Sequence, residues 1–327
     1  MSFTHLHVHT EYSLLDGVNK STYLFERVKE LGMSSVAISD HGVMYGVPEF
    51  WKYSKDFGVK PIIGCEIYLA PGDMTVRKEV DGLKYYHLLL LAKNRTGYLN
   101  LIKIVTEGNL RGMYYKPRVD KAILEKYSEG IICTSACMAG PLSRHILRNE
   151  VDKSVEWLKF LKETFKENFY IEVQRHGFDA SDELPVDFTL SALGEDGGEE
   201  SIDNQNEQKY SNQKLLQLAD DYKIDVVATT DAHYLKAEDR DVQTILFAVK
   251  DGRLINDDNC RTGYVGTYLL SPEEMQTKFS DIPYVLDNSQ KIDEQIENYN
   301  IGFDRIQPKF WNIPEGETTQ DELIRQV

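Results

Sequence analysis

Cysteine is scarce in this sequence, with only four residues among 327, and these four show no regular spacing. A disulfide-stapled secreted domain is therefore excluded, and a reducing cytoplasm is the expected compartment. The sequence also lacks any run of eighteen apolar residues, so we expect no membrane-spanning helix and no membrane partner. Its first residues, MSFTHLHVHT, lack the basic and apolar segments of a secretion signal.

Basic residues are few as well. The 37 Lys and Arg stand against 53 Asp and Glu, which gives a formal net charge of −16. This balance argues against a nucleic-acid-binding surface spread over the whole chain. Ten of the acids, and no Lys or Arg, lie between residues 177 and 208, and without them the net charge would be −6. The segment GEDGGEESIDNQNEQ is typical of a solvated, mobile insertion, which we place at about 190–208.

The remaining composition is that of a globular protein. A length of 327 residues and a hydrophobic content of 41% fit one large α/β domain plus an appendage. Short apolar runs such as SVAIS, KPIIGCEIYLA and IDVVATT predict strands, and amphipathic segments such as STYLFERVKELG predict helices between them. Repeated βα units predict a parallel sheet with helices outside. Roughly seven strands favour a closed barrel over an open sheet.

The alternating pattern loosens after about residue 250. SPEEMQTKF begins like a capped helix, with Ser271 as the cap and Glu274 three residues later. A proline-containing tail follows, and the sequence ends in TTQDELIRQV, which predicts one more helix. We therefore expect a barrel over residues 1–250 and an appendage and linker over 251–327, cut from a longer protein.

Histidines and carboxylates gather in five short motifs, HLHVHT, SDHG, GCE, YYH and TTDAH. In a strand, alternate residues share a face, so His5, His7 and His9 are expected to point the same way. Three histidines would make a poor core because each buried polar ring needs a partner, which a metal ion would supply. A lone HxH motif would leave the core and the metal interpretations equally open. The other four motifs favour the metal.

Four of the five motifs fall at the end of a candidate strand, where α/β proteins place their sites. Imidazole and carboxylate ligands suit Zn²⁺, Mn²⁺ or Fe²⁺. We therefore expect a polynuclear metal site. Outside HLHVHT, its candidate residues are Asp40, His41, Glu66, His87, Asp231 and His233.

Other residues carry weaker signals. Asp16, in LLDG, could be a metal ligand or the acid of a turn before Gly17. Cys133 and Cys137 are both candidates, and since a buried free cysteine is usually a small apolar residue, one of them is expected in the core. His145 and His176 have no motif around them and are interpreted as structural.

At these residues the sequence resembles the PHP (polymerase and histidinol phosphatase) family, and within it the N-terminal PHP domains of bacterial DNA polymerase III alpha subunits. The resemblance rests on HLHVHTEYSLLDG, ISDHGVMYG, GCEIYLAPG, YYHLLLLAKNRTGYLNL and TTDAHYL, with SPEEM and PEGET in the tail. It covers nearly the whole chain except the acidic insertion. It implies an α/β PHP fold, a distorted (β/α)₇ barrel with a C-terminal helical appendage, and a three-metal site at the carboxyl ends of the strands.

The resemblance also implies a ligand set of nine residues. His5 is left out, because many family members have Asp at that position. The expected cofactors are three divalent metals, zinc first, with manganese or iron as alternatives. One metal would be held by His7, His9, Glu66 and Asp231, a second by Asp16, His41 and His233, and a third by Glu66, His87 and Cys137.

The function implied is phosphodiester hydrolysis in DNA replication, as a proofreading 3′→5′ exonuclease that acts on the primer 3′ end. The alternative is a catalytically silent, metal-stabilised scaffold that docks a proofreading exonuclease subunit. A free-standing phosphatase on small esters is disfavoured by the polymerase-like tail. The expected partners are DNA, the rest of the polymerase chain and other replisome subunits. The acids of a nucleotidyltransferase site would lie beyond Val327, so we expect this chain to lack polymerase activity.

Overall fold

A computed structural model describes residues 3–185, 205–302 and 313–326, so most of the predicted acidic insertion lies outside the described residues. The strands are β1 Ser35–Ile38, β2 Lys60–Leu69, β3 Tyr86–Ala92, β4 Met113–Tyr114, β5 Lys116–Val119, β6 Ile131–Thr134, β7 Phe169–Gln174 and β8 Val226–Thr229. The helices are α1 Ser21–Glu30, α2 Val47–Phe57, α3 Arg95–Arg111, α4 Lys121–Tyr127, α5 Pro141–Leu147, α6 Val151–Phe165, α7 Gln205–Tyr222, α8 Arg240–Asp251, α9 Pro272–Lys278, α10 Tyr284–Gln295 and α11 Thr319–Gln326, with short 3₁₀ turns at Lys166–Asn168 and Ala237–Asp239.

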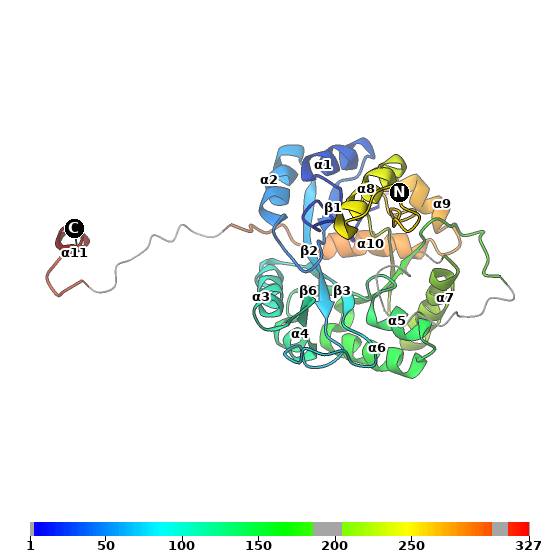
Figure 1. Ribbon diagram of the computed structural model, residues 1–327, viewed down its shortest axis with the longest axis horizontal. Helices are drawn as coiled ribbons and strands as arrows, with labels where there is room; N and C mark the ends of the chain where they lie inside the picture. The colour runs from blue at the N-terminus through cyan, green and yellow to red at the C-terminus, as the bar shows by residue number, and fades with distance from the viewer. Residues whose placement is uncertain (1–2, 186–204, 303–312, 327) are drawn as a thin grey trace.

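The strands form one curled sheet with helices packed around it (Figure 1). Its order is β4-β5-β2-β3-β6-β7-β8, and β1 pairs with β2. The predicted α/β fold, a distorted barrel with helices outside, is confirmed in the form of a curled, mixed sheet. The helices predicted around residue 274 and in TTQDELIRQV are present as α9 and α11.

The expectation of a parallel sheet is wrong at β4, which pairs antiparallel with β5, and at β3. This strand runs antiparallel to both neighbours, with Leu90 opposite Cys65 of β2 and Cys133 of β6. The connection over residues 70–85 contains no helix. Parallel strands normally need such a crossover helix, so the chain turns back directly and the strand direction reverses.

The N-terminal segment, predicted as a regular strand, forms only isolated bridges in the structure. His5 bridges to Val36 of β1, and Val8 bridges to Ala232, just after β8. The His9 amide donates to the Ala232 carbonyl at 2.9 Å. The segment therefore joins the first part of the curled sheet to its last strand, and this places its histidines in the middle of the fold.

Apolar side chains fill both sides of the sheet. Leu88 and Leu90 belong to the main core under the helices, whereas Leu89 and Leu91 belong to a smaller cluster inside the curled sheet. Because β3 is buried on both faces, its sequence is a continuous apolar run rather than an alternating one. Each fully buried leucine contributes roughly 1.5–3 kcal/mol to folding. This core fixes the strand ends that carry the polar motifs.

Helices α9 and α10, after residue 250, also pack on this body. Ser271 Oγ accepts from the Glu274 amide at 3.1 Å, and the Glu274 carboxylate accepts from the Ser271 amide at 2.7 Å, so the predicted capping box is present at α9. Asn288 of α10 donates to the Val226 carbonyl of β8 at 2.7 Å. A domain boundary near residue 250 stays a prediction.

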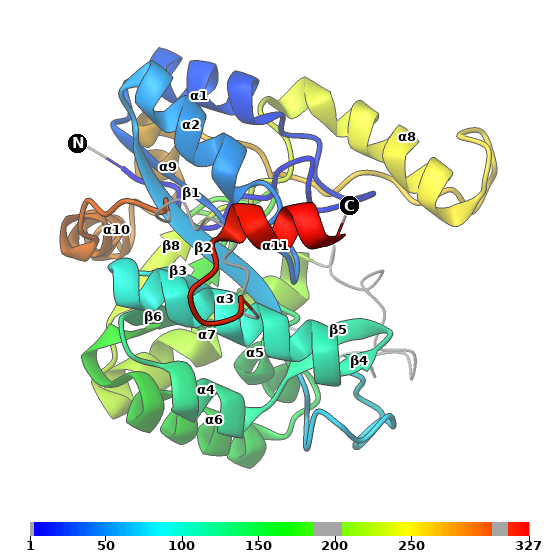
Figure 2. The same cartoon turned by 90° about the vertical axis from the view of Figure 1, so that its left-hand side faces the viewer.

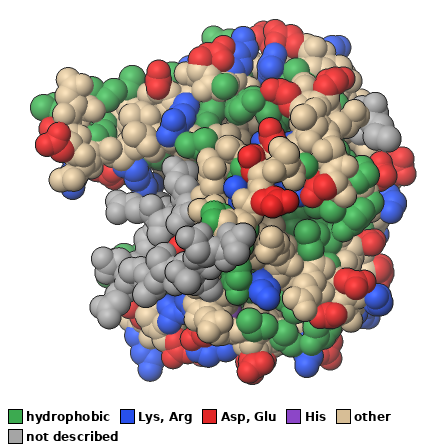
Figure 3. Space-filling view, turned by 90° about the vertical axis from the view of Figure 1, so that its right-hand side faces the viewer, with side chains coloured by type: hydrophobic (Ala, Val, Ile, Leu, Met, Phe, Trp, Pro, Cys, Tyr) green, Lys and Arg blue, Asp and Glu red, His purple; other side chains and the backbone are tan. Residues whose placement is uncertain are grey.

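The surface of the molecule is mixed in charge. On the face drawn in Figure 3, acidic and basic side chains are interspersed with apolar ones. Within the described residues, none of the helices combines the length and the apolar character that crossing a bilayer requires.

Candidate metal centre

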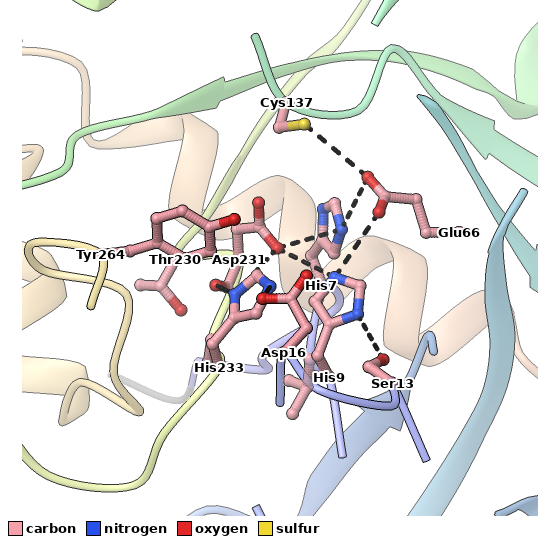
Figure 4. A network of polar contacts seen from close by, with 12 residues as sticks. His7, His9, Ser13, Asp16, Glu66, Cys137, Thr230, Asp231, His233 and Tyr264 are labelled. Carbon is pink, nitrogen blue, oxygen red and sulfur yellow. Dashed lines mark hydrogen bonds and ion pairs between the residues drawn. The ribbon is translucent and has the colours of Figure 1, made fainter. Parts of the chain in front are cut away.

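The nine predicted ligands lie close together although they come from separate parts of the chain, and Figure 4 labels all of them except His41 and His87. His7 and His9 lie in the N-terminal segment, and Asp16 follows in the next loop. The remaining ligands come from the strands or the loops directly after them. These are His41 after β1, Glu66 in β2, His87 in β3, Cys137 after β6, and Asp231 and His233 after β8.

In the first group of ligands, two histidines face two carboxylates. His7 Nε2 lies 3.3 Å from Glu66 Oε1 and 3.3 Å from Asp231 Oδ1. His9 Nε2 lies 3.0 Å from Asp231 Oδ1 and 3.6 Å from Glu66 Oε2. All four side chains are buried. Their donor atoms converge closely enough for one cation to be shared among them.

Asp16 faces two further histidines. Its carboxylate oxygens lie 3.3 Å from His41 Nε2 and 3.8 Å from His233 Nε2. The loop is held in place by Gln243, whose side-chain amide donates to the Asp16 carbonyl at 3.0 Å. The Asp16 carboxylate therefore points toward the cluster rather than back into its own turn.

The third group contains the cysteine. Cys137 Sγ lies 3.7 Å from His87 Nδ1 and 3.8 Å from Glu66 Oε1. Glu66 Oε2 lies 3.2 Å from His87 Nδ1 and 2.7 Å from His41 Nδ1, so Glu66 is within reach of all three groups. Cys133 is instead part of the main hydrophobic core.

Buried polar atoms without a hydrogen-bond partner indicate which kind of ligand this cluster fits. Buried polar atoms without a partner are uncommon, because each costs about 1–3 kcal/mol. A convergent set of imidazole nitrogens and carboxylate oxygens fits divalent metal ions. The buried atoms without a hydrogen-bond partner include seven from the predicted ligands: His7 Nε2, His9 Nε2, Asp16 Oδ1, His41 Nδ1, Glu66 Oε2, His87 Nε2 and Asp231 Oδ1.

Burial and neighbouring charges set the protonation of the cluster. Burial raises the pKa of Glu66, but the surrounding His87, His7 and His41 outweigh it and hold the pKa well below its usual range. Burial, together with the neighbouring His41 and His233, lowers the pKa of His9 to about 3. At neutral pH the Glu66 carboxylate is therefore ionised and His9 keeps a free lone pair. Burial lowers the pKa of His41, but the hydrogen bonds and charges of Asp16 and Glu66 outweigh it and raise the pKa to about 10, so a metal bound there would displace a proton.

Residues 5–176 match the profile of the PHP domain. This chain belongs to the PHP family. It is 37% identical over 303 residues to the DNA polymerase III subunit alpha of Borreliella burgdorferi, covering 92% of this chain and 24% of the relative. It is 35% identical over 332 residues to that of Treponema pallidum, covering 100% of this chain and 26% of the relative. The chain thus spans about a quarter of the length of these relatives.

Among solved structures, the PHP chain resembles a Bifidobacterium adolescentis protein proposed to be a metal-dependent phosphoesterase. The TM-score is 0.44 at 12% sequence identity, and the match covers 86% of this chain and 96% of that one.

A buried glutamate behind the PHP cluster was missed by the sequence analysis. Glu172 of β7 lies 2.8 Å from His7 Nδ1. It also accepts from the Gln174 side-chain amide at 2.7 Å and from the Thr229 hydroxyl at 2.5 Å. The available signal was the alternation of Glu172 and Gln174 with apolar residues in a strand that is buried throughout. Glu172 orients His7 so that Nε2 faces the cluster.

A second supporting network holds His9. The Ser13 hydroxyl lies 3.0 Å from His9 Nδ1 and donates to Asp40 at 2.8 Å. The same Asp40 carboxylate accepts from the Thr10 amide and hydroxyl. Asp40, a candidate from the SDHG motif, therefore supports His9 from behind and does not face the centre.

The unassigned histidines differ from the cluster in their hydrogen bonding. His5 contacts the Leu270 carbonyl and the Thr230 hydroxyl through its two ring nitrogens. His145 contacts Tyr86 and Glu150 in the same way. His176 contacts Thr230 and Gln208, although it also lines the cavity above the centre. With both nitrogens engaged, none of the three presents a lone pair to a metal.

Proposed function

We propose that this PHP domain binds divalent metals at the nine clustered side chains and hydrolyses phosphodiester bonds at DNA 3′ ends. It would act as a proofreading 3′→5′ exonuclease within the alpha subunit of a bacterial replicative polymerase, in the cytoplasm. The observation that carries this proposal is the convergence of the predicted ligands, seven of which have a buried polar atom without a hydrogen-bond partner. A purely structural polar network would satisfy these atoms among themselves.

We propose that the ligands divide into three sets, with Glu66 near all of them. The first metal would be held by His7, His9, Glu66 and Asp231, the second by Asp16, His41 and His233, and the third by Glu66, His87 and Cys137. The mixture of imidazole, carboxylate and thiol groups favours zinc, with manganese or iron as alternatives. Bound metals supply Lewis acidity toward the phosphate and activate water at neutral pH.

The protein's own residues determine how a substrate reaches the centre. The cavity above it, bordered by His176, Tyr264 and Thr267, has a volume of about 30 Å³. That space admits a group of the size of a water molecule but not a nucleotide. The terminal phosphodiester must therefore reach the metals from the edge of this cavity. We expect this to require an unpaired 3′ end. Because a mispaired end frays at lower cost, this geometry favours single-stranded or mismatched 3′ ends.

The same narrow cavity is the observation that favours the alternative function. A centre closed to nucleotides could serve only to stabilise the fold, because metals bound to the folded state alone stabilise it by mass action. The domain would then be a scaffold that docks a proofreading exonuclease subunit and other replisome subunits.

The exonuclease proposal is tested with metal-supplemented chain and a 5′-labelled oligonucleotide, either single-stranded or in a duplex with a matched or mismatched 3′ end. We expect metal-dependent shortening, fastest on the unpaired ends. Asp231→Asn and His9→Ala should abolish it, whereas Asp220→Asn, an exposed acid on α7, should leave it unchanged.

Cleavage that persists in both ligand variants would mean a contaminating nuclease and would overturn the proposal. Metal-loaded protein that cleaves nothing, even within the complete polymerase chain, would establish the scaffold alternative. We also propose that this chain does not extend a primer. Template-dependent incorporation by the chain alone would contradict that.

A further inference from the structure

One side of the metal centre is bordered by aromatic and basic side chains that the proposed chemistry does not use. Tyr68 of β2 stands opposite Arg118 of β5 on one side and opposite His87 of β3 on the other. Cross-strand partners project to the same face, and alternation along β5 brings Lys116 to the face of Arg118. Lys116 therefore lies above the same end of the sheet as the proposed ligand His87.

Ring contacts connect this lysine to the centre. The Tyr68 ring lies 5.3 Å from the His87 ring and 6.1 Å from the His41 ring, centroid to centroid. On its other side, Lys116 Nζ lies 5.2 Å from the centroid of Tyr68. Lys116 thus contacts an aromatic ring that also contacts two proposed ligands. A nucleic-acid strand whose end reached the metals would pass within reach of this cation.

The hairpin of β4 and β5 holds an exposed tyrosine in a left-handed backbone conformation. Tyr114 pairs with Lys116, so Tyr115 alone forms the turn, with a φ of 59°. A bulky residue is strained in this left-handed region, which glycine adopts freely. Yet Tyr115 is 70% exposed, so burial does not compensate for the strain. Strain retained on an exposed aromatic residue points to a binding role.

The hairpin and the loop beside it are locally basic, whereas the whole chain is acidic. Residues 74–84 and 111–118 contain six Lys and Arg but only two acids, in a protein of net charge −16. Buried Arg118 joins the two segments, donating to the carbonyls of Val76 and Lys84, each at 3.0 Å. Lys84 Nζ in turn lies 4.8 Å from the Tyr115 ring centroid. Figure 2 shows the hairpin of β4 and β5 beside the loop that leads into β3.

We propose that Tyr115, Lys84 and Lys116 form a track, here called the rim track, that binds the single strand leading into the metal centre. The two ammonium groups bind phosphates adjacent to the one being cleaved, and Tyr115 stacks on a base. Stacking on an aromatic ring beside basic groups tolerates every base, as an exonuclease that removes any nucleotide requires. This inference rests on the proposed function and names the residues that present its substrate.

The test measures binding separately from cleavage. The full chain is titrated with a fluorescent oligothymidylate whose 3′-terminal linkages are phosphorothioates, and anisotropy gives the Kd. We expect Tyr115→Ala combined with Lys116→Gln to raise the Kd about tenfold, because one stacked base and one phosphate contact are lost. Lys116→Gln alone should reduce the slope of log K against log salt by about 0.7. Tyr115→Phe, which retains the ring, should bind like the wild type.

A matched pair elsewhere serves as the control. Tyr23 on α1 is 56% exposed and lies three residues after the exposed Lys20, so Tyr23→Ala with Lys20→Gln removes an exposed ring and an exposed cation elsewhere. This control should leave the Kd unchanged. A Kd that is equal in the wild type and the rim variants, or equally raised in the control, would overturn the rim track.

The two proposals fail in different ways. If the wild type binds the strand through the rim track but never cleaves it, the exonuclease proposal fails and the rim track stands. If the rim variants bind and cleave like the wild type, the rim track fails and the exonuclease proposal stands. If the rim variants lose affinity for a peptide of the replisome but not for the oligonucleotide, the rim track is a protein-docking surface and this inference is wrong.

Discussion

His7 and Glu172 form a buried pair in which His7 Nδ1 lies 2.8 Å from a carboxylate oxygen of Glu172, 165 residues away in the sequence. Burial lowers the pKa of His7, but Asp231, Glu172 and Glu66 outweigh it and hold the pKa well above its usual value. With Nδ1 bound to Glu172, the Nε2 atom faces Glu66 and Asp231. Glu172 is therefore a positioning residue for a proposed metal ligand.

The first prediction is that Glu172→Gln weakens metal binding while leaving the fold intact. Loss of a carboxylate behind a metal-ligating histidine typically lowers metal affinity about 10–100-fold. Competition with a chromogenic chelator measures this affinity. Glu163→Gln, an exposed acid on α6, is the matched control and should have no effect. Identical affinities in Glu172→Gln and the wild type would show that His7 is oriented without this contact.

The second prediction concerns stoichiometry. Nine proposed ligands, with Glu66 counted in two sets, give sets of four, three and three, which suit three metals when water completes the two smaller sets. Elemental analysis of protein purified without chelator and supplemented with zinc and manganese should therefore find close to three metals per chain. A content below one per chain would eliminate the trinuclear arrangement.

The third prediction is that chelation lowers the melting temperature. Metal that binds only the folded state stabilises it by about 2.7 kcal/mol per site at a free concentration of 100 times Kd. His9→Ala should show a smaller shift on adding chelator, because one proposed ligand is already lost. His145→Gln should retain the full shift, since both its ring nitrogens are engaged away from the centre. Equal shifts in all three proteins would count against His9 as a ligand.

The fourth prediction is a pH dependence that arises at His145. Burial lowers the pKa of His145, although the adjacent Glu150 acts to raise it. The unfolded chain, with a histidine pKa near 6.5, then binds more protons than the folded chain, so stability is lost as pH falls below about 6.5. Between pH 7 and 5.5, chemical denaturation should show a smaller loss of unfolding free energy in His145→Gln than in the wild type. An equal loss would mean that His145 is protonated in the folded protein.

Much of the centre could be predicted because its residues lie in short motifs at strand ends. The DAH motif after β8 and the HVH motif of the N-terminal segment are local patterns, and the fold brings their side chains together. Glu172 could not be assigned in this way, because its role depends on a contact with His7 from a distant strand. The direction of β3 depends on the connection before it, and the apolar run of the strand carries no information on that.

The short hairpin of β4 and β5 also escaped the sequence analysis. Its strands have two and four residues and include Pro117, so they give no clear alternation. The turn residue Tyr115 has neither the glycine nor the asparagine that usually marks such a position. Tyr115, which we propose binds DNA, therefore occupies a turn position where its residue type is unusual.

The last prediction concerns the left-handed backbone conformation of Tyr115. At a φ of 59°, Tyr115→Gly removes the strain of a side chain in the left-handed region. Glycine also makes the unfolded chain more flexible, which costs roughly 0.5–1 kcal/mol, an amount similar to the strain released. The melting temperature should therefore stay level or rise. The affinity for single-stranded DNA should fall, because the ring that stacks on the base is gone. Thermal unfolding and anisotropy on the same sample measure both quantities. If Tyr115 serves stability, its replacement should lower the melting temperature and leave the affinity of the folded protein unchanged, whereas if it serves binding, the affinity alone should fall.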